Sequence, residues 1–212
     1  MLLDSVNVAM PVDGTAIAKR PQDGPVDVRR LGLEGDGVGS PKHHGGIDQA
    51  AYAYGVPDYE WWEAELGRRL PPAMFGENLT ITELHSGLCS VGDLLRIGTA
   101  LFQVTSPRIP CETLARRMGD PGFIGRFREA RRPGVYLRVL EQGVVTPGDP
   151  VTYEPAPAGA LSILELQELF YAREAPVADL ERALRAPIDV RSRRQLVRRL
   201  LNAEQLGRRS EA

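Results

Sequence analysis

Short apolar runs separated by turn residues recur through residues 1–154, and most of them are too short for a helix. We expect strands at 15–18, 25–29, 49–54, 78–82, 94–98, 100–105, 135–140 and 144–153. Hairpins are expected to join the first two runs, 94–98 with 100–105, and the last two around Gly143. Many short strands at this spacing predict a mainly β fold, a closed or nearly closed β-barrel over residues 1–154.

Two short helices are expected to interrupt the strands. The segment from Asp58 to Leu66 has a helical pattern and stops at Gly67. The segment from Glu112 to Met118 follows a proline and stops at Gly119.

The pattern changes after residue 154. Residues 155–162 have the composition of a linker, and residues 163–212 are expected to form a small three-helix domain. Its helices are predicted at 163–172, 177–185 and 191–204, and Ser162 with Glu165 has the spacing of a capping box. The apolar residues of this domain are too few for an independent core, so we expect it to pack on the barrel or on a second subunit. It contains no Cys or His, and we expect it to lie outside any metal site.

Composition and charge restrict the classes of function. The net charge of −2 argues against nucleic acid as the main partner. The arginines of the last helix (Arg191, Arg193, Arg194, Arg198 and Arg199) are expected to face solvent or an acidic partner, and DNA binding is the weaker interpretation. The N-terminus does not resemble a signal peptide, and no apolar run is long enough to cross a membrane. Two cysteines cannot form a disulfide framework, so a cytoplasmic protein with free thiols is expected.

A Gly-rich stretch contains two of the three histidines. Gly32-Leu33-Glu34-Gly35-Asp36-Gly37 is followed by Lys42-His43-His44-Gly45-Gly46-Ile47-Asp48. Glycines allow successive backbone N–H groups to approach an anion, and lysine and histidine add donors. This chemistry suits a phosphate or another oxyanion; zinc is a weaker interpretation. The alternative is a structured turn whose histidines bond to backbone carbonyl groups.

Cys111 is the candidate reactive group. It follows Ser106-Pro107-Arg108-Ile109-Pro110 and precedes a predicted helix, whose dipole lowers the pKa of a thiol. Such a thiolate is a nucleophile or a soft metal ligand. The alternative is a buried Cys on the apolar stripe formed with Leu114 and Met118. Cys89 has no comparable setting and is expected to be structural.

These segments occur in an order that resembles the MOSC domain, and in particular its YiiM-like branch. The segments that carry the resemblance are Thr15-Ala16-Ile17-Ala18-Lys19-Arg20-Pro21, Gly32-Leu33-Glu34-Gly35-Asp36, His44-Gly45-Gly46-Ile47-Asp48, Phe75-Gly76-Glu77-Asn78-Leu79-Thr80, Gly92-Asp93 and Pro107-Arg108-Ile109-Pro110-Cys111. Tyr136-Leu137-Arg138-Val139 followed by Gly143 resembles the last strands of the family. The three-helix tail resembles the appendage of that branch.

The resemblance implies a β-barrel that holds a molybdenum–pterin cofactor (molybdopterin), with Cys111 as the metal ligand. It implies reduction of N-hydroxylated compounds, such as hydroxylamino-purines and amidoximes, with electrons from a flavin or haem protein. The expected cofactor-binding residues are Thr15, Lys19, Arg20, Lys42, His43, His44, Gly45, Gly76, Asn78 and Arg108. The expected catalytic residues are Cys111, Asp36, Asp48 and His44, the last three as candidate acids.

Two other functions remain open at this point. A non-catalytic carrier could hold the cofactor or a sulfur species on Cys111 for delivery to other enzymes. A plain anion-binding module would need no metal.

Overall fold

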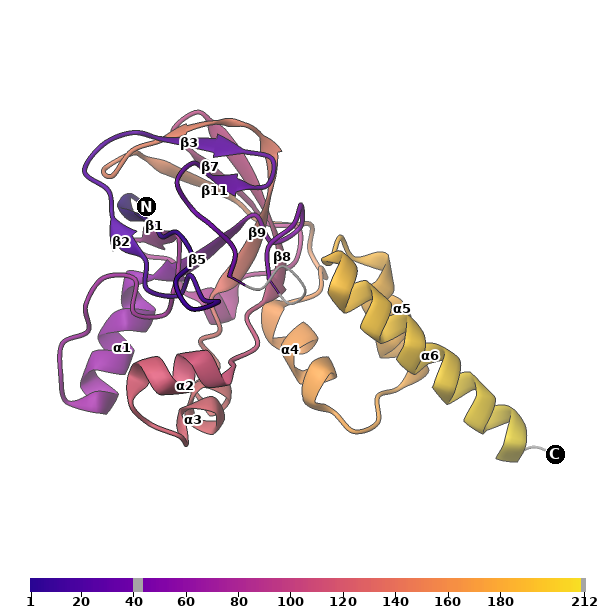
Figure 1. Cartoon of the computed structure of the whole chain (residues 1–212). Coiled ribbons are helices and arrows are strands. Elements are labelled where there is room, and N and C mark those ends of the chain that lie inside the picture. The colour runs from indigo at the N-terminus through magenta and orange to yellow at the C-terminus, as the bar shows by residue number, and fades with distance from the viewer. Residues whose placement is uncertain (40–43, 211–212) are drawn as a thin grey trace.

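The computed structural model describes residues 1–39 and 44–210 (Figure 1). Its strands are β1 (Leu3–Val8), β2 (Arg20–Pro21), β3 (Val26–Arg29), β4 (Gly32–Leu33), β5 (Ala51–Gly55), β6 (Leu79–Ile81), β7 (Leu94–Ile97), β8 (Ala100–Pro107), β9 (Val135–Glu141), β10 (Gly143–Val145) and β11 (Val151–Glu154). Its helices are α1 (Val56–Leu66), α2 (Glu112–Met118), α3 (Phe123–Glu129), α4 (Ile163–Tyr171), α5 (Val177–Arg185) and α6 (Val190–Ser210), with a 3₁₀ turn at Ser86–Leu88. No helix in the described part of the chain is both long and apolar enough to cross a membrane.

The strands form an open mixed sheet rather than the expected barrel. Eight strands follow the order β11-β7-β8-β9-β5-β6-β1-β2, and β10, β3 and β4 form a smaller sheet. All pairs are antiparallel except β5 with β6. Within the described ranges, one isolated bridge, Leu2 with Pro150, joins the start of β1 to the residues before β11. Because no ladder of strand pairs closes the sheet, the barrel is not confirmed.

Local pairing was predictable only where two strands are joined by a tight turn. β7 and β8 pair as expected around Gly98-Thr99. The expected hairpin of 15–18 with 25–29 is wrong, because β3 pairs with β10 and β4. The expected pairing of 135–140 with 144–153 is also wrong, since β9 lies between β8 and β5. These pairings join segments far apart in the sequence, which hydrophobic pattern alone does not specify.

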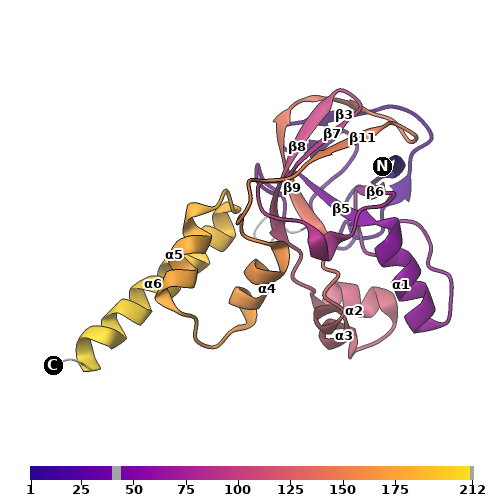
Figure 2. The ribbon, with the colours of Figure 1, turned by 180° about the vertical axis from the view of Figure 1, so that it is seen from behind.

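The helices lie below and beside the sheet. Helices α1 and α2 end at Gly67 and Gly119 as predicted, both with left-handed backbone. Helix α3 and strand β1 were not predicted. Figures 1 and 2 show α1, α2 and α3 grouped under one end of the sheet, while α4, α5 and α6 lie to one side.

Two buried clusters hold these layers together. One runs through the sheet and includes the inward residues of the C-terminal helices, among them Ile163, Leu166, Leu180 and Leu196. The helices of the tail therefore pack on the sheet, as expected from their small apolar content. The second cluster is aromatic and buries Tyr52, Tyr54, Trp62, Phe75, Phe123 and Phe127 beneath the sheet, against α1 and α3.

The backbone of Leu84 packs directly against Gly55, at the end of β5, and leaves no space for a side chain there. A Cβ at this position would lie 1.7 Å from the carbonyl oxygen of Leu84. Gly125, an exposed residue of helix α3, has no atom within 4 Å of the position of a Cβ. We expect Gly55→Ala to destabilise the protein by roughly 1–3 kcal/mol or more, because the backbone of Leu84 must move. Gly125→Ala should stabilise it by up to about 1 kcal/mol, because alanine favours the helix.

Urea unfolding of the two variants measures this difference. Equal midpoints for Gly55→Ala and the unmodified protein would contradict the close approach of Leu84.

Candidate functional site

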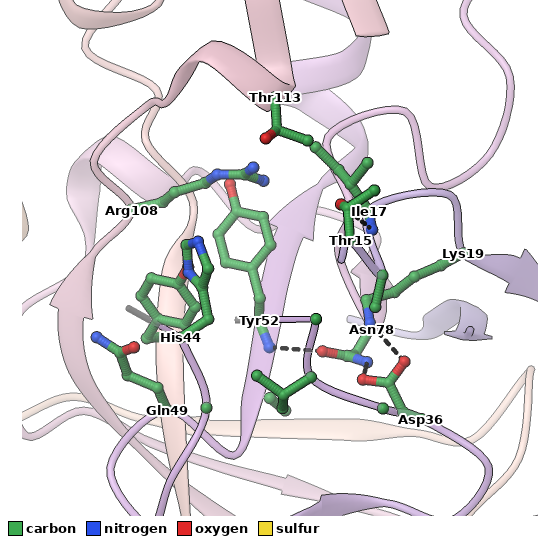
Figure 3. Close-up of a pocket in the computed structure, with 18 of the residues that line it drawn as sticks. Thr15, Ile17, Lys19, Asp36, His44, Gln49, Tyr52, Asn78, Arg108 and Thr113 are labelled. Atoms are coloured by element: carbon green, nitrogen blue, oxygen red, sulfur yellow. Dashed lines mark hydrogen bonds and ion pairs between the residues drawn. The ribbon is translucent and has the colours of Figure 1, made fainter. Parts of the chain in front are cut away.

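A cavity opens where loops from distant parts of the sequence meet the first residues of β5 and the start of α2. Its walls consist of Gly14–Ile17, Lys19, Asp36–Gly39, His44, Gly45, Gln49, Ala51, Tyr52, Gly76, Asn78, Arg108, Cys111, Thr113 and Tyr136. Figure 3 shows Arg108 and His44 on one side, Lys19, Asn78 and Asp36 on the other, and Tyr52 between them.

Cys111 lies in this wall, half-buried, at the residue before the first turn of α2. A hydrogen bond with the His44 side chain lowers the pKa of its thiol to about 6, although burial opposes the shift. The backbone N–H groups of Leu114 and Thr113 and the positive charge of Arg108 also lower it. These surroundings favour the thiolate. Cys89 differs from Cys111 in burial and in pKa, because it is fully buried and burial raises the pKa of its thiol.

Arg108 places a buried positive charge in the cavity. Its side chain is only 5% exposed, and it donates a hydrogen bond to the carbonyl oxygen of Phe75. The guanidinium carbon lies 5.1 Å from the ring centroid of Tyr52. Its Nε has no hydrogen-bond partner, and no carboxylate of the described residues forms an ion pair with it. A buried guanidinium with an unpartnered donor is costly, so this site favours an anion.

The opposite wall is held by Asn78 and Asp36. Asp36 Oδ1 accepts hydrogen bonds from Lys19 Nζ at 2.5 Å and from the backbone N–H of Ala9 at 2.9 Å. Its Oδ2 accepts from Asn78 Nδ2 at 2.8 Å. Burial lowers the pKa of Lys19, and the Asp36 carboxylate opposes that shift. Asp36 is thus engaged through both oxygens.

The sequence and the structure both have known relatives. The pattern of the MOSC domain matches residues 40–152, more than half of the chain. The chain belongs to the MOSC domain family. The crystal structure of YiiM from Geobacillus stearothermophilus is 30% identical and superimposes with a TM-score of 0.80, covering 94% of this chain and 98% of YiiM. This MOSC protein is therefore YiiM-like.

Two further MOSC relatives match less of their own length. YflK of Bacillus subtilis is 40% identical over 134 residues, covering 63% of this chain and 61% of YflK. A protein of Gibberella moniliformis named reductase is 31% identical over 182 residues, covering 82% of this chain and 32% of the reductase. The chain thus spans less than two thirds of the length of these two relatives.

Most residues expected from the MOSC resemblance meet in the cavity. They are Thr15, Lys19, Asp36, His44, Gly45, Gly76, Asn78, Arg108 and Cys111. Lys42 and His43 lie outside the described residues. Arg20 is an exposed residue of β2 and does not line the cavity. Of the basic residues expected there, Lys19, His44 and Arg108 line it.

Asp48 also lies away from the cavity wall. Its carboxylate pairs with Arg138 of β9 at 3.0 Å and accepts a hydrogen bond from the backbone N–H of Val190 at 3.0 Å. Its position therefore does not fit the expected role of an acid at the MOSC site. It connects the His44 loop to the sheet and to α6.

Two tyrosines of the MOSC cavity were missed by sequence reasoning. Tyr52 donates a hydrogen bond to the carbonyl oxygen of Pro133 at 2.8 Å, and the hydroxyl of Tyr136 lies 3.4 Å from His44 Nδ1. Burial raises the pKa of both phenols, so they stay neutral. The sequence pattern around them is that of buried aromatic residues in strands, and no neighbouring residue indicates which face of the sheet they occupy.

The thiol chemistry of the cavity depends on His44. We expect His44→Ala to raise the pKa of Cys111 by roughly one unit or more, because burial is then opposed only by backbone N–H groups and Arg108. The thiolate exists above the pKa, so alkylation at pH 7 should slow and the midpoint of its pH profile should rise.

The measurement is the rate of iodoacetamide alkylation against pH in the cofactor-free protein. A Cys89→Ser background leaves one thiol to report. An unchanged midpoint would show that His44 does not hold the thiolate.

Proposed function

We propose that this MOSC protein binds the molybdenum cofactor in the cavity and reduces N-hydroxylated compounds, with the Cys111 thiolate as the metal ligand. The observation that carries the proposal is a thiol whose surroundings lower its pKa, facing the same cavity as a buried arginine with an unpartnered Nε. Thiolates are ligands that soft metals prefer, and a guanidinium suits a phosphate.

The residues present fit such a group. The orphaned Nε of Arg108 points to a missing acceptor within the buried wall. Lys19, paired with Asp36, adds a positive charge at the opposite wall. Gly76 lies close to Ile17 and Arg108, since a Cβ there would be 2.8 Å from Ile17 Cγ1 and 3.6 Å from Arg108 Nη1. A phosphate or the pterin at this place would offer an acceptor to the Nε of Arg108.

The proposed reaction breaks the N–O bond of a hydroxylamine or amidoxime. Two electrons and two protons are taken up, and the products are the reduced nitrogen compound and water. When bound, the cofactor supplies the two-electron redox chemistry. The chain binds and orients it, and Tyr52 and Tyr136 provide neutral wall groups.

His44 is the proposed proton donor among the three expected acids. Asp36 has both oxygens occupied by hydrogen bonds, and Asp48 does not line the cavity. The His44 ring lies at the cavity beside both Cys111 and Tyr136. General acids act within hydrogen-bond reach of the reacting group, and His44 meets this condition for a substrate held over the thiolate.

Electrons would come from a flavin- or haem-containing protein. The name of the Gibberella moniliformis relative, reductase, supports a reductive role. The partner is expected to dock at the mouth of the cavity.

A non-catalytic carrier is the second candidate, and the same half-buried thiolate supports it, because a reactive thiolate can also hold a sulfur species. Expression in a host that makes the cofactor, followed by elemental analysis and turnover assays, separates the functions. Molybdenum with reduction of a hydroxylamino-purine or amidoxime by a chemical electron donor supports the reductase. Molybdenum without turnover supports the carrier, and an absence of molybdenum supports the anion-binding module.

Cys111→Ala should lose its molybdenum, because a methyl group cannot replace a soft thiolate ligand. Cys89→Ala should keep it, since Cys89 is buried away from the cavity. Elemental analysis of the two purified variants measures the difference, with circular dichroism as the control for folding. Equal molybdenum content in a folded Cys111→Ala protein would remove Cys111 as the ligand.

A further inference from the structure

Helix α6 reaches back to the cavity through its first turn. Arg191 Nη1 donates hydrogen bonds to the carbonyl oxygen of Gly45 at 2.7 Å and to Oε1 of Gln49 at 3.1 Å. Its Nη2 donates to the carbonyl oxygen of His44 at 3.1 Å. All three acceptor residues line the cavity. No residue of the described part of the tail lines the cavity, but Arg191 contacts the loop that does.

The arginine itself is fixed by a buried carboxylate. Asp189, fully buried, accepts hydrogen bonds from the backbone N–H groups of Arg191 at 2.9 Å and Ser192 at 3.1 Å. The Ser192 hydroxyl donates to the same carboxylate. These hydrogen bonds hold the first turn of α6, and they fix the backbone position of Arg191 independently of its contacts with the loop.

The loop is held on its other side by the sheet. The hydroxyl of Thr105 in β8 donates to the carbonyl oxygen of Asp48 at 2.7 Å. Arg138 of β9 pairs with the Asp48 carboxylate and also donates to the carbonyl oxygens of Pro187 and Ile188, just before α6. The segment 44–49 thus lies between the sheet and the tail, bonded to both.

We propose that Arg191 is a positioning residue that fixes the His44 wall of the cavity and couples the C-terminal helices to it. A guanidinium presents N–H donors from two terminal nitrogens held in one plane, whereas the three donors of an ammonium group diverge from a single nitrogen. The proposal concerns the geometry of the loop, so it stands whether or not the cavity holds molybdenum.

Other arginines of α6 provide matched comparisons. Arg193 donates to the carbonyl oxygens of Leu184 and Ala186, and Arg199 to those of Leu169 and Ala172, where they hold the ends of α5 and α4. Arg194 and Arg198 are exposed. Arg194→Gln therefore removes the same charge from the same helix without touching the loop.

Hydrogen exchange of the cofactor-free full chain tests the proposal. Arg191→Gln should speed exchange in the segment 44–50 by roughly tenfold or more, because several hydrogen bonds to the loop are lost. Arg194→Gln should leave this segment unchanged. Arg191→Lys keeps the charge, and should still show most of the increase, since its donors diverge from a single nitrogen on a shorter side chain and do not match the positions of Nη1 and Nη2.

The ring signals of His44 in NMR spectra report on the cavity itself. The chain has only three histidines, so the His44 signals can be assigned with a His44→Ala variant. They should shift in Arg191→Gln and remain in place in Arg194→Gln.

If Arg191→Gln lowers overall stability, a double-mutant cycle with Gln49→Ala still tests the contact between the two side chains. The effects of the two substitutions on exchange in the segment 44–50 should not add, because the residues are in contact, and additive effects would contradict the contact. The proposal is overturned if loop exchange or the His44 signals stay unchanged in Arg191→Gln, or if Arg191→Lys restores both fully.

Discussion

The side-chain amide of Asn78 holds three segments of the chain in contact, and the cavity depends on it. Its Oδ1 accepts from the backbone N–H of Tyr52 at 3.1 Å, and its Nδ2 donates to the carbonyl oxygen of Asn7 and to Asp36. Asn78 is 4% exposed, so each unmade bond would leave a buried polar group without a partner. Strand β5, strand β1 and the Asp36 loop are thereby fixed relative to one another, and Lys19 follows through its pairing with Asp36. One wall of the cavity is set by hydrogen-bond satisfaction rather than by apolar packing.

The other wall is set by charge. Arg108 and the Cys111 thiolate face the same cavity, and each lowers the cost of burying the other. His44 contributes more to the thiolate than Arg108 does, and the helix start contributes through the N–H groups of Thr113 and Leu114. The thiolate offsets part of the charge of the guanidinium, and the Nε of Arg108 remains without a hydrogen-bond partner. The cavity therefore combines a soft anionic ligand with a buried cation that still favours a second anion. MOSC chemistry as proposed here needs this combination, because a thiolate alone would suit a metal but not a phosphate-bearing cofactor.

The residues of the cavity could be predicted from the sequence more accurately than the pairing of the strands. The segments around Asp36, His44, Asn78 and Cys111 could be found because each joins glycine or proline to a polar residue, and such junctions are local. Tyr52 and Tyr136 could not be found, because the choice between core and cavity depends on strand pairing across many residues. The expected barrel was not confirmed for the same reason, since strand count and spacing do not reveal whether β1 and β11 pair along their length. Arg20 was misplaced because it follows Lys19, although neighbouring residues of an extended chain point to opposite sides. Asp48 was misplaced because it shares a segment with His44, but the chain turns at Gly45 and Gly46 and the Asp48 carboxylate meets Arg138 and α6.

The arginines of α6 show why a charged helix face cannot be interpreted from composition alone. A run of arginines normally indicates a solvated surface, and Arg194 and Arg198 fit that pattern. Arg191, Arg193 and Arg199 instead donate to backbone carbonyl groups of the cavity loop, α5 and α4. Carbonyl groups at helix ends and in loops lack internal partners, and forked donors on one helix satisfy several of them in different segments. The contacts of Arg193 and Arg199 join the helices of the tail to one another, and those of Arg191 add a polar attachment to the apolar one made by Ile163, Leu166 and Leu196. A change in the placement of α6 must alter these hydrogen bonds together, and one set of them ends on the loop that carries His44.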